Sequence, residues 1–212
     1  MKKLLLLGIV LVLLTGCVNM KNTNVESIIS NALSSKASKA NINRHGYSYY
    51  LPRGLKVIDS TDYNEVFKDS KYKYYLYVDV VSYFNEIKED YKVRDKSIIS
   101  RTIKKDSKTG YLEVNEYKND KYLIEIMYNY AKIEVMVDYD DINKTVAYAI
   151  SILSSVTYND SVISNLMGED VLNFIEEEFN IFDTVSSDGN YLKSEEEYIY
   201  EEDTIPDTDL IK

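Results

Sequence analysis

The feature that most constrains the fold is a change of hydrophobic period near residue 140. From residue 47 to 139, apolar and polar residues alternate in short runs separated by turn residues, which is typical of β-strands. From residue 140 to 156, the apolar residues recur at helical spacing instead. Strands followed by a helix predict an α+β fold, namely an antiparallel sheet of about five to seven strands with a long helix packed on one face.

The longest predicted strand covers residues 71–84. One of its faces is apolar enough for a core, and it carries Tyr72, Tyr74, Leu76, Val78 and Val80. The other face is mixed, and it carries Lys73, Tyr75, Tyr77, Asp79, Val81 and Tyr83. Such a mixed face suits a surface that a helix or tail half covers. Further strands are predicted at 47–51, 55–58, 97–104, 111–117, 122–128 and 131–139, with a loop or short helix at 85–95.

The composition divides the chain into successive regions. Residues 17–43 are polar and predict a tether with a short helix capped by Asn24 or Ser27, and residues 44–158 form the α+β domain. Residues 159–182 predict a further helical segment. From residue 169 onward the chain holds 15 acidic residues against two lysines. We therefore expect residues 183–212 to form an acidic, disordered tail, because they cannot bury much apolar surface.

The order of elements, with Tyr50-Leu51-Pro52-Arg53-Gly54-Leu55 at the first turn and a closing amphipathic helix, resembles the PsbP-like α/β/α sandwich. The resemblance covers residues 25–157. It implies a binding or assembly role without catalysis, as in several small exported or lipid-anchored proteins.

The N-terminus predicts export. Lys2 and Lys3 precede an apolar run that, at about 13 residues, is shorter than the roughly 20 needed to span a bilayer. The end of this run, Leu14-Thr15-Gly16-Cys17, resembles the lipobox of bacterial lipoproteins. The resemblance implies cleavage of residues 1–16, a diacylglyceryl group on Cys17 and a location on the extracytoplasmic face of the cell membrane. Cys17 is the only cysteine, so an intramolecular disulfide is excluded.

Motifs for chemistry are sparse. His45 is the only histidine, which leaves no histidine-rich metal site, and no GxSxG elbow or nucleotide-binding glycine motif occurs. Residues 184–195 fit an EF-hand loop poorly, because the first position is Thr184. We therefore expect no metal, no cofactor and no catalytic residue. The acidic charge and the export signal disfavour nucleic acid as a partner.

Carboxylate pairs remain a possible route to glycoside hydrolysis. The predicted strands hold six acidic residues, which we interpret as ordinary surface charge: Asp79, Glu113, Glu116, Glu125, Glu134 and Asp138. For Asp79, an ion pair or a tyrosine hydrogen bond would account for its apolar neighbours.

These observations predict a non-catalytic envelope lipoprotein that binds another protein or helps to assemble a membrane complex. The alternative is a solute- or glycan-binding lipoprotein, with Tyr75, Tyr77, Asp79 and Tyr83 as ligand-binding residues. A cell-wall hydrolase is a third hypothesis, and it requires two carboxylates across a cleft.

Overall fold

The computed structural model describes residues 24–35, 38–88 and 90–168. The lipobox with Cys17, the part of the helical segment beyond residue 168 and the acidic tail at 183–212 lie outside the described residues.

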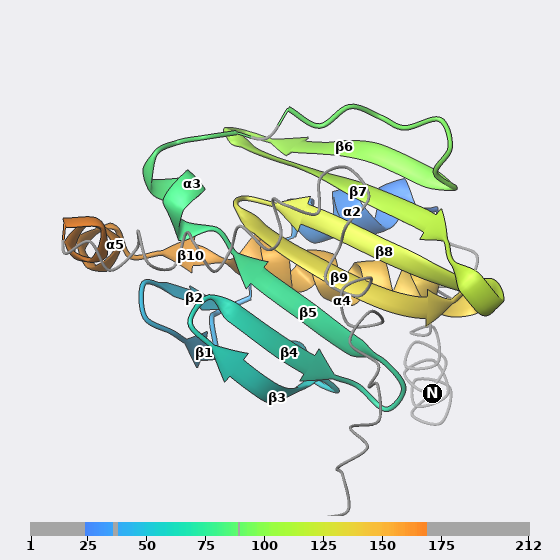
Figure 1. The fold of residues 1–212 in the computed structure, drawn as a ribbon, viewed down its shortest axis with the longest axis horizontal. Helices are drawn as coiled ribbons and strands as arrows, with labels where there is room; N and C mark the ends of the chain where they lie inside the picture. Colours follow the sequence, from blue (N-terminus) through green and yellow to red (C-terminus); the bar gives the residue numbers. More distant parts are fainter. Residues whose placement is uncertain (1–23, 36–37, 89, 169–212) are drawn as a thin grey trace, which may run out of the picture.

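The centre of the domain is a seven-stranded antiparallel sheet with the order β3-β4-β5-β9-β8-β7-β6 (Figure 1). Its strands are β3 (Lys56–Thr61), β4 (Asn64–Lys68), β5 (Lys73–Val78), β6 (Ile99–Lys105), β7 (Lys108–Glu116), β8 (Lys121–Tyr128) and β9 (Ala131–Asp138). The predicted α+β class and the antiparallel sheet are confirmed. β3 and β6 are the two edge strands of this sheet.

Tight turns set the register of the central strands. β8 and β9 are joined by Asn129 and Tyr130, which both have positive φ, as a two-residue hairpin turn requires. A 3₁₀ turn (Lys118–Asp120) joins β7 to β8. At Gly110 a Cβ atom would lie 2.0 Å from the carbonyl oxygen of Met127 on β8, so only glycine fits there.

Two helices pack on the same face of this sheet, which we call the helix-covered face. α2 (Val25–Ser34) and α4 (Ile142–Ser155) contact each other, and α4 also contacts β8 and β9. Both helices lie behind the sheet in Figure 1. The strand residues of this face include Leu76, Leu112, Ile126 and Ile133, all 2% exposed or less. The hydrophobic core therefore lies between the sheet and the two helices.

The N-terminus of α2 has the predicted side-chain cap, whereas the N-terminus of α4 has no side-chain cap. The Asn24 side chain accepts a hydrogen bond from the backbone N–H of Glu26 at 3.0 Å, as expected for the cap of α2. The two acidic residues just before α4, Asp140 and Asp141, lie in a 3₁₀ turn (Tyr139–Asp141), and Asp141 makes no side-chain capping bond. Its carboxylate binds Lys71 and Tyr72 instead.

A three-stranded sheet packs beside α4 on the helix-covered face. It consists of β1 (Ile42–Asn43), β2 (Tyr47–Tyr49) and β10 (Thr157–Tyr158), with β2 in the middle. α5 (Asp160–Gly168) follows β10 and contacts α3 (Val80–Phe84). The Tyr49 ring lies 5.8 Å from that of Phe67 on β4, so aromatic packing joins the two sheets.

The predicted strand at residues 71–84 is wrong in its second half. β5 ends at Val78, and a short helix, α3 (Val80–Phe84), follows it. The cause is Asp79, whose carboxylate accepts the backbone N–H of Ser82 at 2.8 Å and so caps this helix. The β3–β4 hairpin extends over residues 56–68, although the sequence predicted only a strand at 55–58 there.

Candidate functional site

The four predicted ligand-binding residues fall into two places. Tyr75 and Tyr77 point from β5 to the face opposite the helices, which we call the second face. Asp79 and Tyr83 belong to the cap and body of α3. The structure therefore separates the four residues into two groups.

The Tyr83 ring is engaged by other tyrosines. It stacks on Tyr158 with 3.8 Å between ring centroids and meets the Tyr130 ring edge-on at 5.6 Å. Its hydroxyl donates a hydrogen bond to Asp160 Oδ1 at 2.7 Å. Burial and this contact with Asp160 raise the pKa of Tyr83 to about 12. The ring thus joins α3 to α5, and one of its faces is covered by Tyr158.

Three glutamates form one row across the second face. Glu134 on β9 is directly opposite Glu125 on β8, which is directly opposite Glu113 on β7. Tyr75 and Ser100 lie at the two ends of this row, on β5 and β6. In the sequence, these glutamates look like separate surface charges. Counting outward from the Asn129-Tyr130 turn would have paired Glu125 with Glu134, because residues equidistant from a two-residue turn face each other.

Each glutamate of the row has a cationic or hydrogen-bonding partner. Lys132 Nζ lies 3.0 Å from Glu134 Oε1, and the Tyr111 hydroxyl donates to Glu125. Such partners are needed because like charges directly opposite each other destabilise a sheet. Within the described residues, no group of three or more His, Cys, Asp or Glu side chains could hold a metal ion.

Glu113 is the most extensively bound carboxylate of the row. It accepts hydrogen bonds from the Tyr91 hydroxyl at 2.8 Å and Ser97 Oγ at 3.1 Å, and Arg94 Nη1 lies 3.3 Å away. Burial acts against ionisation, but the hydrogen bonds from Asn115 and Tyr91 and the charge of Arg94 hold the pKa of Glu113 below its ordinary value.

The Glu113 contacts attach the segment after α3 to the sheet. We call Glu113, Tyr91 and Arg94 the Glu113 clamp. The Tyr91 ring also stacks on Tyr111 with a centroid distance of 4.2 Å, and its hydroxyl lies 2.6 Å from Ser100 Oγ. Figure 1 shows the connection between α3 and β6 running alongside β6, at the edge of the sheet.

A second buried glutamate joins the two sheets at the opposite end. Glu65 on β4 is 1% exposed and lies on the helix-covered face. Its carboxylate accepts a hydrogen bond from the Tyr47 hydroxyl at 3.1 Å and pairs with Arg44 Nη2 at 2.5 Å. We call Glu65, Arg44 and Tyr47 the Glu65 clamp. It fixes β2 and the turn before it against β4.

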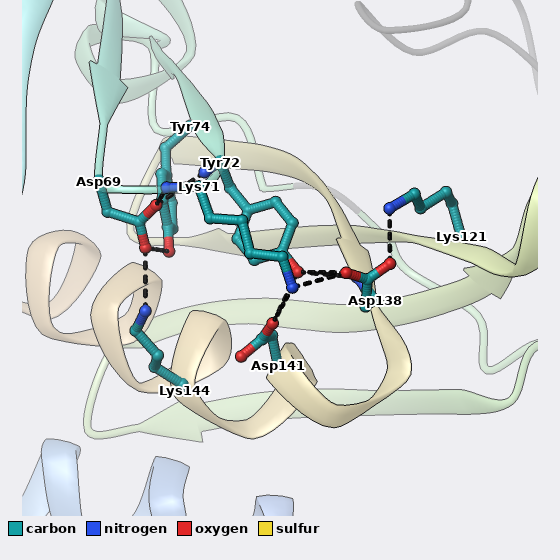
Figure 2. A network of polar contacts seen from close by, with 8 residues as sticks. All are labelled: Asp69, Lys71, Tyr72, Tyr74, Lys121, Asp138, Asp141 and Lys144. Atoms are coloured by element: carbon teal, nitrogen blue, oxygen red, sulfur yellow. Dashed lines mark hydrogen bonds and ion pairs between the residues drawn. The ribbon is translucent and has the colours of Figure 1, made fainter.

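An ion-pair network ties the β4–β5 turn to the start of α4 (Figure 2). Its members are Asp69, Lys71, Tyr72, Tyr74, Lys121, Asp138, Asp141 and Lys144. Lys71 Nζ lies 2.6 Å from Asp138 Oδ2 and 2.8 Å from Asp141 Oδ2. Hydrogen bonds from Lys121 and Lys71 hold the pKa of Asp138 well below its ordinary value. Because its three acids and three lysines neutralise one another, the network is best explained as a structural contact.

The surfaces left exposed lie mainly along the two edges of the large sheet. In the described part of the chain β3 pairs with β4 alone, and five of its six residues are exposed. Four of the six exposed large hydrophobic side chains belong to residues 84–98, which run from the end of α3 to the start of β6. These four are Phe84, Ile87, Val93 and Ile98, and the other two are Ile58 on β3 and Tyr139.

No protein-family model matches this chain, and no curated protein shows a significant sequence match. Among the described helices, none has the length and hydrophobicity required to cross a membrane.

Proposed function

We propose that this chain is a lipid-anchored extracytoplasmic protein, held at the cell membrane by diacylglyceryl-Cys17, whose domain binds another envelope protein and catalyses no reaction. The motif Leu14-Thr15-Gly16-Cys17 supports the anchor. We also propose that the domain has a PsbP-like arrangement with a long packed helix, followed by an acidic C-terminal extension. These features suit a domain that is presented to partners outside the cell.

The observation that carries the binding role is the exposed edge strand β3. An edge strand offers unpaired backbone groups to which an extended segment of a partner can add as a further strand. The register shifts between Val57 and Asp59, so Ile58 is the bulged residue, and this residue is 49% exposed. Backbone pairing beside β3, together with a pocket on the partner for Ile58, would supply both affinity and specificity.

In the solute- or glycan-binding alternative, the ligand would bind to the second face, where tyrosines lie beside carboxylates. Rings that stack on sugars must be accessible, yet Tyr75 is 8% and Tyr111 is 5% exposed. A hydrolase would need two carboxylates facing a substrate. The bound state of Glu113 favours a structural role for that residue. Protein binding at β3 therefore has the stronger support.

The anchor is tested by Cys17→Ser in cells that export the full chain. Lipid attachment and signal processing should both stop, while the folded domain stays resistant to protease. Ser27→Ala, outside the motif, is the matched control and should be processed normally. Cleavage of the Cys17→Ser chain between residues 16 and 17 would contradict the lipobox interpretation.

The β3 edge is tested by a photo-crosslinking residue at Ser60, which lies on the same strand, in living cells. We expect one discrete protein adduct that disappears when Ile58→Lys is introduced into the same chain. A crosslinking residue at Thr102, an exposed position on β6, is the control. The absence of any adduct from Ser60 in all growth conditions, or the same adduct from Thr102, would contradict binding at β3.

A further inference from the structure

The β6 edge combines apolar and basic side chains. We use this name for residues 84–88 and 90–105, which include the end of α3, the segment clamped by Glu113 and β6 itself. Phe84, Ile87, Val93 and Ile98 are 43%, 56%, 55% and 48% exposed. They are spaced along one sheet edge beside exposed basic side chains, which indicates an interaction surface, whereas single exposed hydrophobic side chains are ordinary.

The charge of this edge differs from that of the opposite edge. From residue 84 to 105 the sequence holds seven Lys or Arg against four Asp or Glu, and all seven basic residues are exposed. From residue 56 to 68, around β3, it holds two Lys against three Asp or Glu. An anionic partner would therefore prefer the β6 edge.

The tether enters the domain beside this same edge. α2 begins at Val25, and Glu26 pairs with Arg101 Nε on β6 at 2.8 Å. At its other end, the carbonyl oxygen of Leu33 accepts a hydrogen bond from Lys105. Thus α2 follows β6 along its length, and the chain that leads back to Cys17 departs next to the edge.

The length of the tether limits how far this edge can lie from the membrane. Eight residue steps separate Cys17 from Val25, and a fully extended chain covers about 3.3–3.6 Å per residue, or about 29 Å at most. The β3 edge lies six strand spacings from β6, which adds about 29 Å at roughly 4.8 Å per spacing. Of the two edges, only β6 is tied directly to the short tether.

We propose that the β6 edge docks on the anionic lipid headgroups of the membrane to which Cys17 is attached. Lys88, Lys92, Lys96 and Lys104, which are all exposed, bind the lipid phosphates. The apolar side chains enter the boundary between headgroups and acyl chains, as in other interfacial binding surfaces. The Glu113 clamp keeps this surface on the sheet. This inference rests on the proposed lipid anchor, and it orients β3 away from the membrane, toward a partner.

The experiment uses the fact that the chain contains no tryptophan. Ile87→Trp and, as matched control, Ile58→Trp are made in the lipid-modified full chain, which is then reconstituted into vesicles of phosphatidylglycerol and phosphatidylcholine with brominated acyl chains. Bromine quenches tryptophan only at short range. We expect quenching of the Ile87→Trp fluorescence at least about twofold stronger than that of Ile58→Trp, because only the β6 edge meets the lipid.

Charge-reversal variants separate electrostatic docking from mere tethering. In the Ile87→Trp chain, Lys88→Glu, Lys92→Glu and Lys96→Glu together should reduce quenching to the level seen in pure phosphatidylcholine vesicles. The matched set Lys56→Glu, Lys68→Glu and Lys73→Glu, from exposed positions at the other end of the sheet, should leave quenching unchanged.

The outcomes distinguish the two proposals. If the protein floats with the vesicles but both tryptophans are quenched equally, the anchor holds and the docking inference is overturned. If the protein does not float with the vesicles, the lipid anchor itself fails, and the inference fails with it.

Discussion

The two ends of the large sheet are held by similar clamps, the Glu65 clamp and the Glu113 clamp, which fasten different parts of the chain. At each end a buried glutamate on the strand next to the edge binds a tyrosine hydroxyl and an arginine guanidinium. The tyrosine and the arginine lie three residues apart in each case, as Arg44 and Tyr47 or as Tyr91 and Arg94. A buried carboxylate with two such donors fixes one geometry, because any other would leave its charge unsatisfied.

The ends differ in burial and in what each clamp holds. Arg44 approaches Glu65 to 2.5 Å with 30% of its side chain exposed, whereas Arg94 stays 3.3 Å from Glu113 with 54% exposed. The Glu65 clamp joins two sheets and leaves the outer side of β3 accessible. The Glu113 clamp holds a connecting segment alongside β6. The comparison indicates that the Glu65 clamp stabilises the packing between the two sheets, whereas the Glu113 clamp holds an exposed segment against the sheet edge.

Replacing Glu65 should lower the stability of the domain more than replacing Glu113. Glu65→Ala leaves Arg44 and Tyr47 without their acceptor in a buried place, and we expect a loss of about 3 kcal/mol in the free energy of unfolding. Urea denaturation followed by circular dichroism measures it. Asp59→Ala, on the exposed strand β3, is the control and should change the stability by less than about 0.5 kcal/mol. A similar loss for both variants would refute the role of the Glu65 clamp.

Replacing Glu113 should lower the free energy of unfolding by less and should loosen mainly residues 85–98. Glu113→Ala should lower the free energy of unfolding by about 2 kcal/mol, because its arginine partner is more exposed and water can replace part of the contact. Limited proteolysis should then cut within residues 85–98 much faster than in the parent chain. Glu116→Ala, at an exposed position on the same strand, should do neither. A larger loss than that of Glu65→Ala would reverse the comparison.

Acidification should loosen the segment held by Glu113 first and the ion-pair network around Asp138 second. The pKa values of Glu113 and Asp138 lie below their ordinary values of 4.5 and 3.8, so each group contributes stability that is complete above that value and is lost as the pH falls through its lower folded pKa. The pKa of Asp138 is depressed further. Residues 85–98 should therefore loosen at a higher pH than the network of Figure 2, which amide exchange at decreasing pH would detect.

Simultaneous loosening of the two regions, or loosening of the network first, would contradict this order. Glu113→Gln should remove the first step and leave the second, because the amide cannot be protonated in this range.

The regular part of the fold could be predicted from the sequence, because its signals are local. Residues 131–139 alternate along one strand, and the turn at Asn129 and Tyr130 gives the hairpin before it. The strand predicted at residues 71–84 extends too far because the alternating pattern continues past Asp79, which caps α3. A carboxylate that caps a helix looks the same in sequence as one that faces outward from a strand.

The clamps could not be predicted in the same way. Tyr91 and Arg94 lie in a charged stretch whose sequence resembles any exposed loop, and their partner Glu113 comes about 20 residues later. Which loop covers which edge depends on tertiary contacts of this kind. Part of the glutamate row could be predicted from the sequence, because the symmetry of the β8–β9 hairpin alone places Glu125 opposite Glu134.

The proposed docking places the two ends in different surroundings, with the β6 edge at the membrane and the β3 edge away from it. Hydrogen–deuterium exchange of the lipid-modified protein tests it most directly, by comparing vesicles that contain phosphatidylglycerol with vesicles of phosphatidylcholine alone. We expect slower exchange in residues 85–105 on the anionic vesicles and no change in residues 56–61. Protection of residues 56–61, or equal exchange of residues 85–105 on both kinds of vesicle, would contradict the claim.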